Sequence, residues 1–231
     1  MENNTGKYFK YAIGEIILVV IGILIALSIN NWNENRKLRN QEINILVELK
    51  SNLEATLYNF KKDTLFNIKT IQNYTKIKRY INEDLPYDQE LDYSFALIEN
   101  WSSPYPILTA YKSLQATGLD IISNEEIRRE IINLYEYEYP LLHIDYDKSE
   151  WNLNQNVVTP FFSKHIRRIT IRAKLNQARP NDFERLKKND EFLNILQMLI
   201  SLRQDGLINY KNSMKSLEKL IQNLEAETLS R

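Results

Sequence analysis

The sequence predicts an all-α protein in which one N-terminal transmembrane helix continues into an antiparallel, coiled-coil-like bundle of long helices. Three observations support this fold class. The 231 residues include only five glycines and six prolines, which leaves few turns between helix-forming stretches. Residues 16–29 are almost entirely Ile, Leu and Val. Two later stretches, 46–75 and 193–224, carry apolar residues at helical spacing.

The expected organisation has three parts: a short tail at 1–12, a transmembrane helix at 13–32 and one extramembrane domain at 33–231. Roughly 195 residues outside the membrane are enough for a single core or an elongated bundle. Within this domain we expect a stalk helix at 33–82, middle helices at 88–149 and a C-terminal hairpin at 150–231.

The membrane helix is predicted from its composition. Eleven of the fourteen residues from Ile16 to Ile29 are Ile, Leu or Val, and each favours insertion by roughly 0.3 to 0.6 kcal/mol at the bilayer centre. Tyr8 and Tyr11 precede this run and Trp32 follows it, about 36 Å from Tyr8 in a helix. These aromatic residues are expected to be interfacial anchors. A cleaved signal peptide is the alternative, because Ala26-Leu27-Ser28 resembles a cleavage site.

Glu15 lies at one end of the apolar run. In a helix, Glu15, Gly22 and Ala26 fall within about 20° of one line. Gly22 and Ala26 form a pair of small residues four apart, which lets a second helix approach closely. Glu15 is therefore either solvated at the interface or part of a surface through which membrane helices associate, and a homo-oligomer is expected in the second case.

Two stretches resemble a known family. Residues 7–37, KYFKYAIGEIILVVIGILIALSINNWNENRK, and residues 110–136, AYKSLQATGLDIISNEEIRREIINLYE, are similar to the domain-of-unknown-function family 6090, uncharacterised membrane proteins common in Bacteroidota. The resemblance implies an inner (cytoplasmic) membrane protein with a cytoplasmic N-terminus and a periplasmic C-terminal domain. It implies no activity, cofactor or catalytic residue. The basic residues flanking the span do not themselves decide the orientation.

The stalk is predicted from a repeat of eleven residues over three turns. Spacings of three, four and four give the seam Leu46, Leu49, Leu53, Leu57, Phe60, Thr64, Ile68, Ile71 and Thr75. A second helix is expected at 88–100, and a third from Ser103-Pro104 to Gly118. Ser123 and Glu126 form a predicted capping box for the helix that follows.

The C-terminal helix has the clearest periodicity. Alternating spacings of three and four give the seam Leu193, Leu196, Ile200, Arg203, Leu207, Tyr210, Met214, Leu217, Ile221 and Leu224. Arg203 is its only polar member, and Gly206 is the weak point of the helix. The seam is expected to pack on the stalk within one bundle, and an intermolecular coiled coil is the alternative.

Charge is balanced overall but uneven along the chain. Thirty basic residues match thirty acidic ones, so net charge gives no reason to expect a nucleic-acid partner. Residues 161–188 hold nine basic residues against two acidic ones, whereas residues 120–150 hold nine acidic against three basic. These are either solvated helix faces or surfaces for a partner. The candidate partner-binding basic patch is Lys164, Arg167, Arg168, Arg172 and Lys174.

Candidates for chemistry are few. There is no cysteine, which excludes disulfides and thiolate sites. His143, Asp145 and Asp147 have the types of metal ligands, but on a helix only His143 and Asp147 share a face. The tyrosines of YEYEYP at 135–140 would line an aromatic surface on a strand, or the core edge of a helix that ends before Pro140. We expect no cofactor, no metal and no enzymatic activity.

Two functions are consistent with this sequence. The first is a non-enzymatic, single-pass membrane protein whose helical domain binds or organises another envelope protein. The second is a sensor or coupling subunit in which the long helix relays a periplasmic event through the membrane helix to a separate partner.

Overall fold

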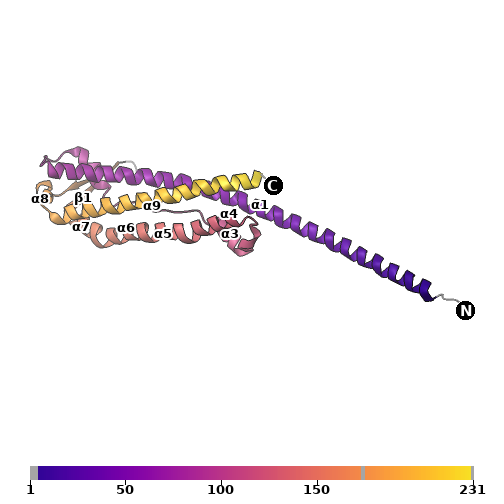
Figure 1. The fold of residues 1–231 in the computed structure, drawn as a ribbon. Coiled ribbons are helices and arrows are strands. Elements are labelled where there is room, and N and C mark those ends of the chain that lie inside the picture. The colour runs from indigo at the N-terminus through magenta and orange to yellow at the C-terminus, as the bar shows by residue number, and fades with distance from the viewer. Residues whose placement is uncertain (1–4, 173–174, 230–231) are drawn as a thin grey trace.

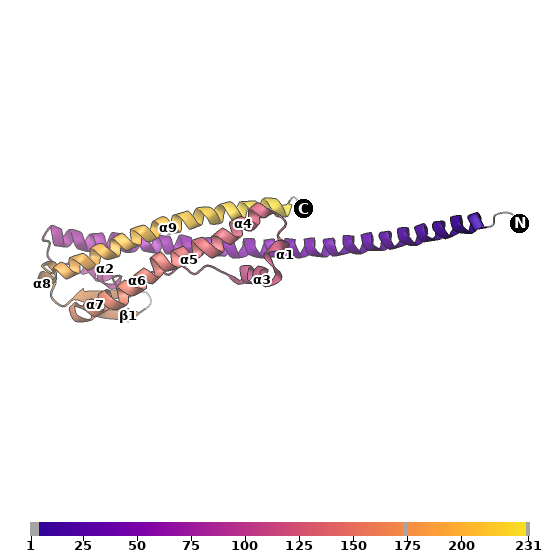
Figure 2. The same cartoon turned by 60° about the horizontal axis from the view of Figure 1, so that its bottom comes forward.

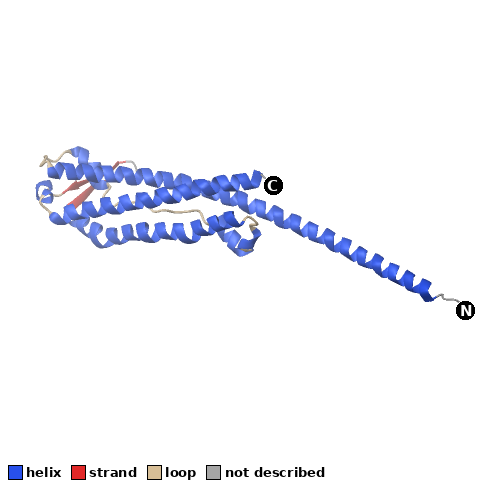
Figure 3. Ribbon diagram, viewed as in Figure 1, coloured by secondary structure: helices blue, strands red, loops and turns tan. Residues whose placement is uncertain are grey.

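The computed structural model describes the backbone of residues 5–172 and 175–229, and the side chains of residues 12–169 and 177–229. It confirms the all-α class, with one small two-stranded sheet. Three long helical stretches lie side by side in an elongated body, and the N-terminal part of the first projects far beyond it (Figures 1 and 3). The C-terminal end lies near the point where this first helix enters the body (Figure 2).

The first helix, α1 (Thr5–Asn82), is continuous over 78 residues. It contains no proline, so every turn beyond the first keeps its backbone hydrogen bond. Every described side chain from Ala12 to Trp32 is exposed, whereas Glu42 is the first buried residue. Glu42 therefore marks the base of the body, and an exposed neck at 33–41 connects it to the apolar segment.

The buried seam of α1 differs from the predicted repeat of eleven. After Leu53 the buried positions continue through Thr56, Phe60, Asn67, Thr70, Tyr74 and Ile77, with spacings of three and four and one step of seven, from Phe60 to Asn67. Leu57 is only partly buried, and Ile68 is 39% exposed. Polar side chains occupy the seam because they find partners: the Thr56 hydroxyl donates to the Asn52 carbonyl and accepts from the Ile107 amide. Tertiary hydrogen bonding therefore overrides the apolar pattern.

The last long helix, α9 (Asp190–Leu229), runs back along α1 towards the base (Figure 1). Six of the ten residues of its predicted seam are buried: Leu196, Ile200, Arg203, Tyr210, Leu217 and Leu224. The other four are partly buried, and a residue next to each of them is buried instead, such as Gly206 beside Leu207 and Ser213 beside Met214. The buried face is wider than predicted because α9 packs against both α1 and the middle helix, and Gly206 leaves room for the Tyr146 ring of the latter.

The middle helix runs without a break from Glu125 to His165. It consists of α4 (Glu125–Asn133), α5 (Tyr139–Leu141), α6 (Lys148–Leu153) and α7 (Thr159–His165), joined by π-helical segments η3 (Leu134–Glu138), η4 (Leu142–Asp147) and η5 (Asn154–Val158). It passes through the expected boundary at 149/150 and through the predicted stop before Pro140.

The π segments keep one face of the middle helix buried. Most of its buried residues are spaced by four, with one step of seven between Tyr139 and Tyr146: Ile127, Ile131, Tyr135, Tyr139, Tyr146, Glu150, Asn154, Val158 and Phe162. In a regular α-helix each step of four drifts by about 40° and the step of seven returns about 20°, which leaves roughly 260° between the first and last of these residues. Each of the three π segments accommodates one extra residue and so turns the face back by about 100°. The three together cancel most of this drift.

Residues 83–124 run from the end of the body opposite the base, which we call the far end, back to the base. They form η1 (Gln89–Leu91), α2 (Asp92–Ala96), an extended segment, α3 (Thr109–Thr117) and η2 (Leu119–Ile121). The predicted helix at 88–100 is thus much shorter, and Ser103-Pro104 begins no helix, because Pro104 and Pro106 keep the residues before them extended. Gly118, with φ of 107°, ends α3 as predicted. The cap of α4 is Asn124, because Ser123 instead donates to Glu42.

A β-hairpin and a short helix occupy the far end. Strand β1 (Ile166–Arg172) pairs antiparallel with β2 (Leu175–Pro180), with an irregularity between Arg168 and Thr170. Helix α8 (Phe183–Lys187) leads into α9. The sequence did not predict these strands. Arg179 of β2 fixes the hairpin on α2 through two hydrogen bonds to Asp92, at 3.1 and 2.7 Å.

Candidate functional site

The apolar part of α1 is the first candidate site. From Ala12 onwards α1 has the length and apolar composition needed to cross a membrane. Glu15, Gly22 and Ala26 lie in this exposed segment, and a Cβ atom added at Gly22 would meet nothing within 4 Å. The stripe is therefore open to a second helix. Whether it associates with one stays a prediction.

Of the three predicted interfacial anchors, the structure describes the side chain of Trp32. Trp32 is 62% exposed, and the Arg36 guanidinium lies 5.1 Å from the centre of its ring. This cation–π contact places a positive charge beside the aromatic ring at the end of the apolar run. The side chains of Tyr8 and Tyr11 lie outside the described residues.

The second candidate site is a polar layer inside the body, made by Asn67 and Tyr74 of α1, Glu150 and Asn154 of the middle helix, and Arg203 of α9. All five side chains are buried. The layer separates two apolar clusters, one towards the base that includes Phe60, and one towards the far end that includes Phe192. A polar layer between two apolar cores fixes the register of the helices.

Arg203 is the centre of the polar layer. Its Nε donates to Glu150 Oε1 at 2.5 Å, and its Nη1 donates to the Tyr74 hydroxyl at 2.5 Å. Its Nη2 donates to the backbone carbonyl of Asn100 at 2.8 Å. One guanidinium thus connects all three long helices and the extended segment. These contacts explain why an arginine occupies the otherwise apolar seam predicted for the C-terminal helix.

Burial sets the ionisation of the layer. Desolvation raises the pKa of Glu150, and the neighbouring Arg203 charge opposes this effect. Desolvation also raises the pKa of the Tyr74 hydroxyl, so that it stays a neutral donor. Among the described residues, Asn67 Nδ2, Glu150 Oε2 and Asn154 Oδ1 have no hydrogen-bond partner. Such unpaired buried atoms reduce the stability that the layer contributes.

The predicted basic patch is described in part. Arg168 pairs with Glu99 at 2.8 Å and lies over the Phe162 ring. Lys164, at the end of α7, and Arg167, on β1, are exposed. The side chain of Arg172 and the whole of Lys174 lie outside the described residues. The role of the patch in binding stays a prediction.

The acidic segment and the basic segment do not pair with each other among the residues that the structure describes. Acids of the middle helix reach α9 and α3 instead: Glu130 pairs with Lys219 at 2.6 Å, and Glu136 accepts from Tyr111 at 2.7 Å. Basic residues of the far end contact the segment after α1, where Lys187 pairs with Asp84 at 2.6 Å. Both segments thus serve the packing of the bundle.

The other two predicted patterns lie in the middle helix. His143 Nδ1 is 3.2 Å from Asp147 Oδ2, which confirms that these two share a face. Tyr135 and Tyr139 are buried and Tyr137 is exposed, so the aromatic surface expected on a strand is wrong. Tyr135 instead stacks on Tyr111, with ring centres 4.2 Å apart. These tyrosines belong to the core edge.

The polar layer could not be found from periodicity alone. Glu150, Asn154 and Tyr146 are aligned with the apolar stripe only because the π segments correct the helical drift. The available signal was the four-residue spacing from Ile127 to Phe162, which a regular helix does not keep on one face. Arg203, the polar member of the predicted C-terminal seam, and Gly206, the predicted weak point of that helix, both have a partner in the middle helix.

Comparisons with known proteins place the chain in one family. Neither curated proteins nor solved structures gave a match. The model of a family of unknown function, DUF6090, matches residues 15–204. These residues include the stripe of Glu15, Gly22 and Ala26, the neck, and the polar layer with Arg203. Because this match spans most of the sequence, the chain belongs to the family of unknown function DUF6090.

Proposed function

We propose that this chain is a non-enzymatic, single-pass membrane protein that holds a helical domain over the bilayer and presents it to another envelope protein. One observation carries the proposal: the apolar segment at 12–32 is fully exposed, yet it is continuous with the helix that forms the body. Such a segment is stable in lipid and unfavourable in water. A continuous helix then holds the domain at a defined height.

Association of the membrane helices is the second part of the proposal. The stripe of Glu15, Gly22 and Ala26 supports a homo-oligomer, since its small residues allow close contact. Replacing Gly22 by Leu is expected to reduce crosslinking between copies in membranes, whereas Ile23→Leu, which keeps the size of the side chain, leaves it unchanged. Equal crosslinking in both variants would contradict association through this stripe.

We propose the inner membrane as the location, with the N-terminus in the cytoplasm and the body in the periplasm. The proposed anchor and the family resemblance support this location. Because the chain has no cysteine, single-cysteine variants report topology directly. An impermeant maleimide added after permeabilisation of the outer membrane is expected to label Lys211→Cys, but to label Lys7→Cys only after lysis of the inner membrane. The reverse pattern would overturn this orientation.

The interaction role is tested at the far end of the body. A photo-crosslinking residue at Arg167, which is exposed on β1, is expected to capture one envelope protein reproducibly in intact cells. Replacing Lys164 by Glu should reduce that product if the basic patch contributes, and Lys61→Glu, an exposed residue of α1, is the matched control. A product that is insensitive to Lys164→Glu removes the patch from the proposal.

A sensor or coupling subunit is the second candidate, and the polar layer favours it. The extended segment after α2 borders a surface hollow of about 430 Å³, lined in part by Asp63, Asn100 and Trp101. The Asn100 carbonyl accepts from Arg203, which also contacts Tyr74 of α1. An event in the hollow would therefore reach the helix that enters the membrane. A helix-breaking Asn35→Pro substitution in the neck distinguishes the two functions, because a relay loses its response whereas an anchored scaffold keeps its partner.

A further inference from the structure

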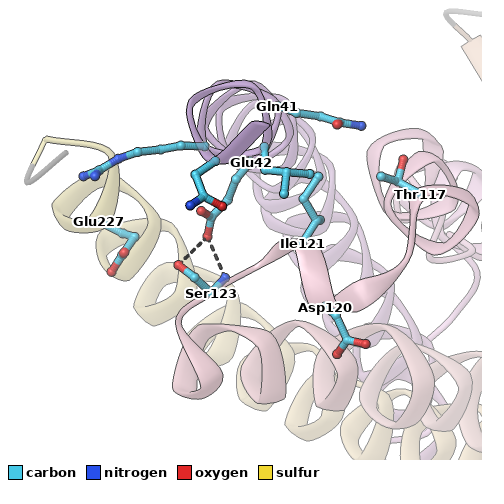
Figure 4. Close-up of a pocket in the computed structure, with 10 residues that line it drawn as sticks. Gln41, Glu42, Thr117, Asp120, Ile121, Ser123 and Glu227 are labelled. Atoms are coloured by element: carbon cyan, nitrogen blue, oxygen red, sulfur yellow. Dashed lines mark hydrogen bonds between the residues drawn. The ribbon is translucent and has the colours of Figure 1, made fainter. Parts of the chain in front are cut away.

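The base of the body contains a pocket that the functions above do not use. It has a volume of about 890 Å³ and lies against α1 at the end of the neck. We call it the base pocket. Its lining includes Asn35, Leu38 and Arg39 of α1, Asp120 and Ile121 of η2, and Glu227 of α9. Figure 4 shows that Asp120 and Ile121 approach α1 from one side and Glu227 from another.

The walls of the base pocket are fixed. Glu42 is buried, and it accepts hydrogen bonds from the Ser123 amide at 2.7 Å and the Ser123 hydroxyl at 2.9 Å (Figure 4). Glu227 accepts from the Asn124 side chain at 2.7 Å. These contacts fasten the start of α4 to both α1 and α9. The base pocket is therefore a feature of the folded body.

The height of the base pocket follows from the unbroken helix. Asn35 lies about 4.5 Å and Arg39 about 10 Å beyond Trp32 along α1. If Trp32 marks the interface, Asn35 falls within the headgroup layer, which is about 5 to 8 Å thick on each side of the hydrocarbon, and the backbone of Arg39 lies just beyond it. The long Arg39 side chain can reach back towards the bilayer. A lipid headgroup is thus the molecule that the base pocket meets at the highest local concentration.

The chemistry of the base pocket matches a headgroup with two opposite charges. Arg39 is exposed and has no ion pair with any described acid, so its guanidinium is available to a phosphate. Asp120 is also exposed, and its ion pair with Arg128 at 3.1 Å uses one carboxylate oxygen. Leu38 is 53% exposed and lies with Ile121 beside these charges, where it can contact the apolar part of a lipid.

We propose that the base pocket binds the headgroup of an aminophospholipid, with Arg39 holding the phosphate and Asp120 holding the ammonium group. This inference rests on the proposed membrane anchor. It adds a specific lipid contact, which would fix the tilt and rotation of the body over the membrane. The same chemistry exists in soluble glycerophosphoethanolamine, so the experiment must separate the two sources.

The test uses the full chain in nanodiscs with a benzoylphenylalanine residue replacing Thr117, which lines the base pocket. Illumination followed by mass spectrometry is expected to give phosphatidylethanolamine adducts. Arg39→Gln should lower the adduct yield about tenfold, the effect of losing one charge-assisted hydrogen bond. Arg167→Gln, the same change at the far end, should leave it unchanged. Asp120→Asn should abolish the preference over phosphatidylcholine, whose quaternary ammonium donates no hydrogen bond.

Three results would overturn the inference. Equal lipid adducts from Thr117 and from a probe at Met198 in the far half of the body would mean non-specific contact. A crosslink from Thr117 to a second copy would mean a protein interface. Competition by millimolar glycerophosphoethanolamine or inorganic phosphate would mean a soluble ligand. Release of the chain from nanodiscs by alkaline washing would instead contradict the anchor itself, so the two failures are distinguishable.

Discussion

Arg203 and Glu150, on two different long helices, form a hydrogen-bonded ion pair at 2.5 Å in which both side chains are completely buried. The pair lies between two apolar clusters, and Tyr74 and Asn100 complete the coordination of the guanidinium. Removing two charges from water costs several kcal/mol, which good geometry recovers. The main effect of the pair is therefore to allow one register of α9 against the middle helix.

Replacing Arg203 by Met should destabilise the protein by about 3 to 5 kcal/mol, because Glu150 would remain buried without its partner. The double change Arg203→Met with Glu150→Met should bring stability back to within about 1 kcal/mol of the wild type. Denaturant unfolding of the detergent-solubilised full chain measures both. Lys61→Met, which breaks an exposed pair with Glu218, is the control and should cost less than about 1 kcal/mol. Equal costs for Arg203→Met and Lys61→Met would contradict the role of the polar layer.

Gly206 should not tolerate a side chain. A Cβ atom added there would lie 2.4 Å from the ring of Tyr146, so Gly206→Ala is expected to destabilise the body by about 1 to 3 kcal/mol. In water-exposed helices the same change is stabilising, which makes the sign of the effect informative. Gly22→Ala is the matched control, since its site is open. A gain of stability in Gly206→Ala would show that Tyr146 does not pack against this turn.

The seam of α1 can be tested with two apolar truncations. Leu53→Ala, at a fully buried position, should cost about 2 to 5 kcal/mol. Ile68→Ala should cost less than about 1 kcal/mol, because Ile68 is 39% exposed. The repeat of eleven predicted from sequence would make both residues core positions with similar costs. Similar losses in the two unfolding midpoints would therefore support that repeat over the structure.

Acid should loosen the far end of the body first. Lys187 lowers the pKa of Asp84, and the Tyr80 hydroxyl lowers that of Glu90. Burial raises the pKa of Asp92, but hydrogen bonds from Arg179 and Tyr87 outweigh this effect and the net shift is downward. Because these folded pKa values lie below the unfolded ones, their stabilisation is complete above about pH 5 and is lost as the pH falls through the folded values.

Glu138 and Glu150 shift in the opposite direction, since burial raises their pKa values, and their protonation at low pH favours the folded state. Hydrogen exchange at pH 5 and pH 3, corrected for intrinsic rates, is expected to show loss of protection at 84–97 before 127–135. Asp92→Asn should remove part of this pH dependence. Uniform loss of protection along the body would contradict the assignment.

The sequence predicts the long elements well and their exact faces poorly. The end of α1 at Asn82, the stop at Gly118 and six of the ten seam residues of α9 follow from breakers and periodicity. The positions of Thr56, Asn67 and Gly206 do not, because each is buried by a partner distant in sequence. The middle helix could not be derived, since its π segments depend on packing against α9. The hairpin at 166–180 was missed because its arginines appeared to be a helix face and gave no turn signal.

For the candidate sites, the sequence indicates the stripe of Glu15, Gly22 and Ala26, whose role in association stays a prediction, but not the polar layer. Gly22 and Ala26 belong to one uninterrupted helix, where spacing alone determines the face. Glu150 and Arg203 are 53 residues apart and meet only through the fold. Of the predicted basic patch, Arg168 is engaged by Glu99, an acid outside the acidic segment, and the role of the patch in binding stays a prediction.

Alkaline carbonate extraction of membranes that contain the full chain measures whether residues 12–32 of α1 span a bilayer and anchor the body, with detection of both termini to exclude cleavage. The intact chain is expected to stay in the membrane pellet. A variant carrying both Leu18→Arg and Ile25→Arg is expected to be released, because each charge near the bilayer centre opposes insertion by about 2.5 to 3.5 kcal/mol. Recovery of the intact wild-type chain in the supernatant would show that this segment is not a transmembrane anchor.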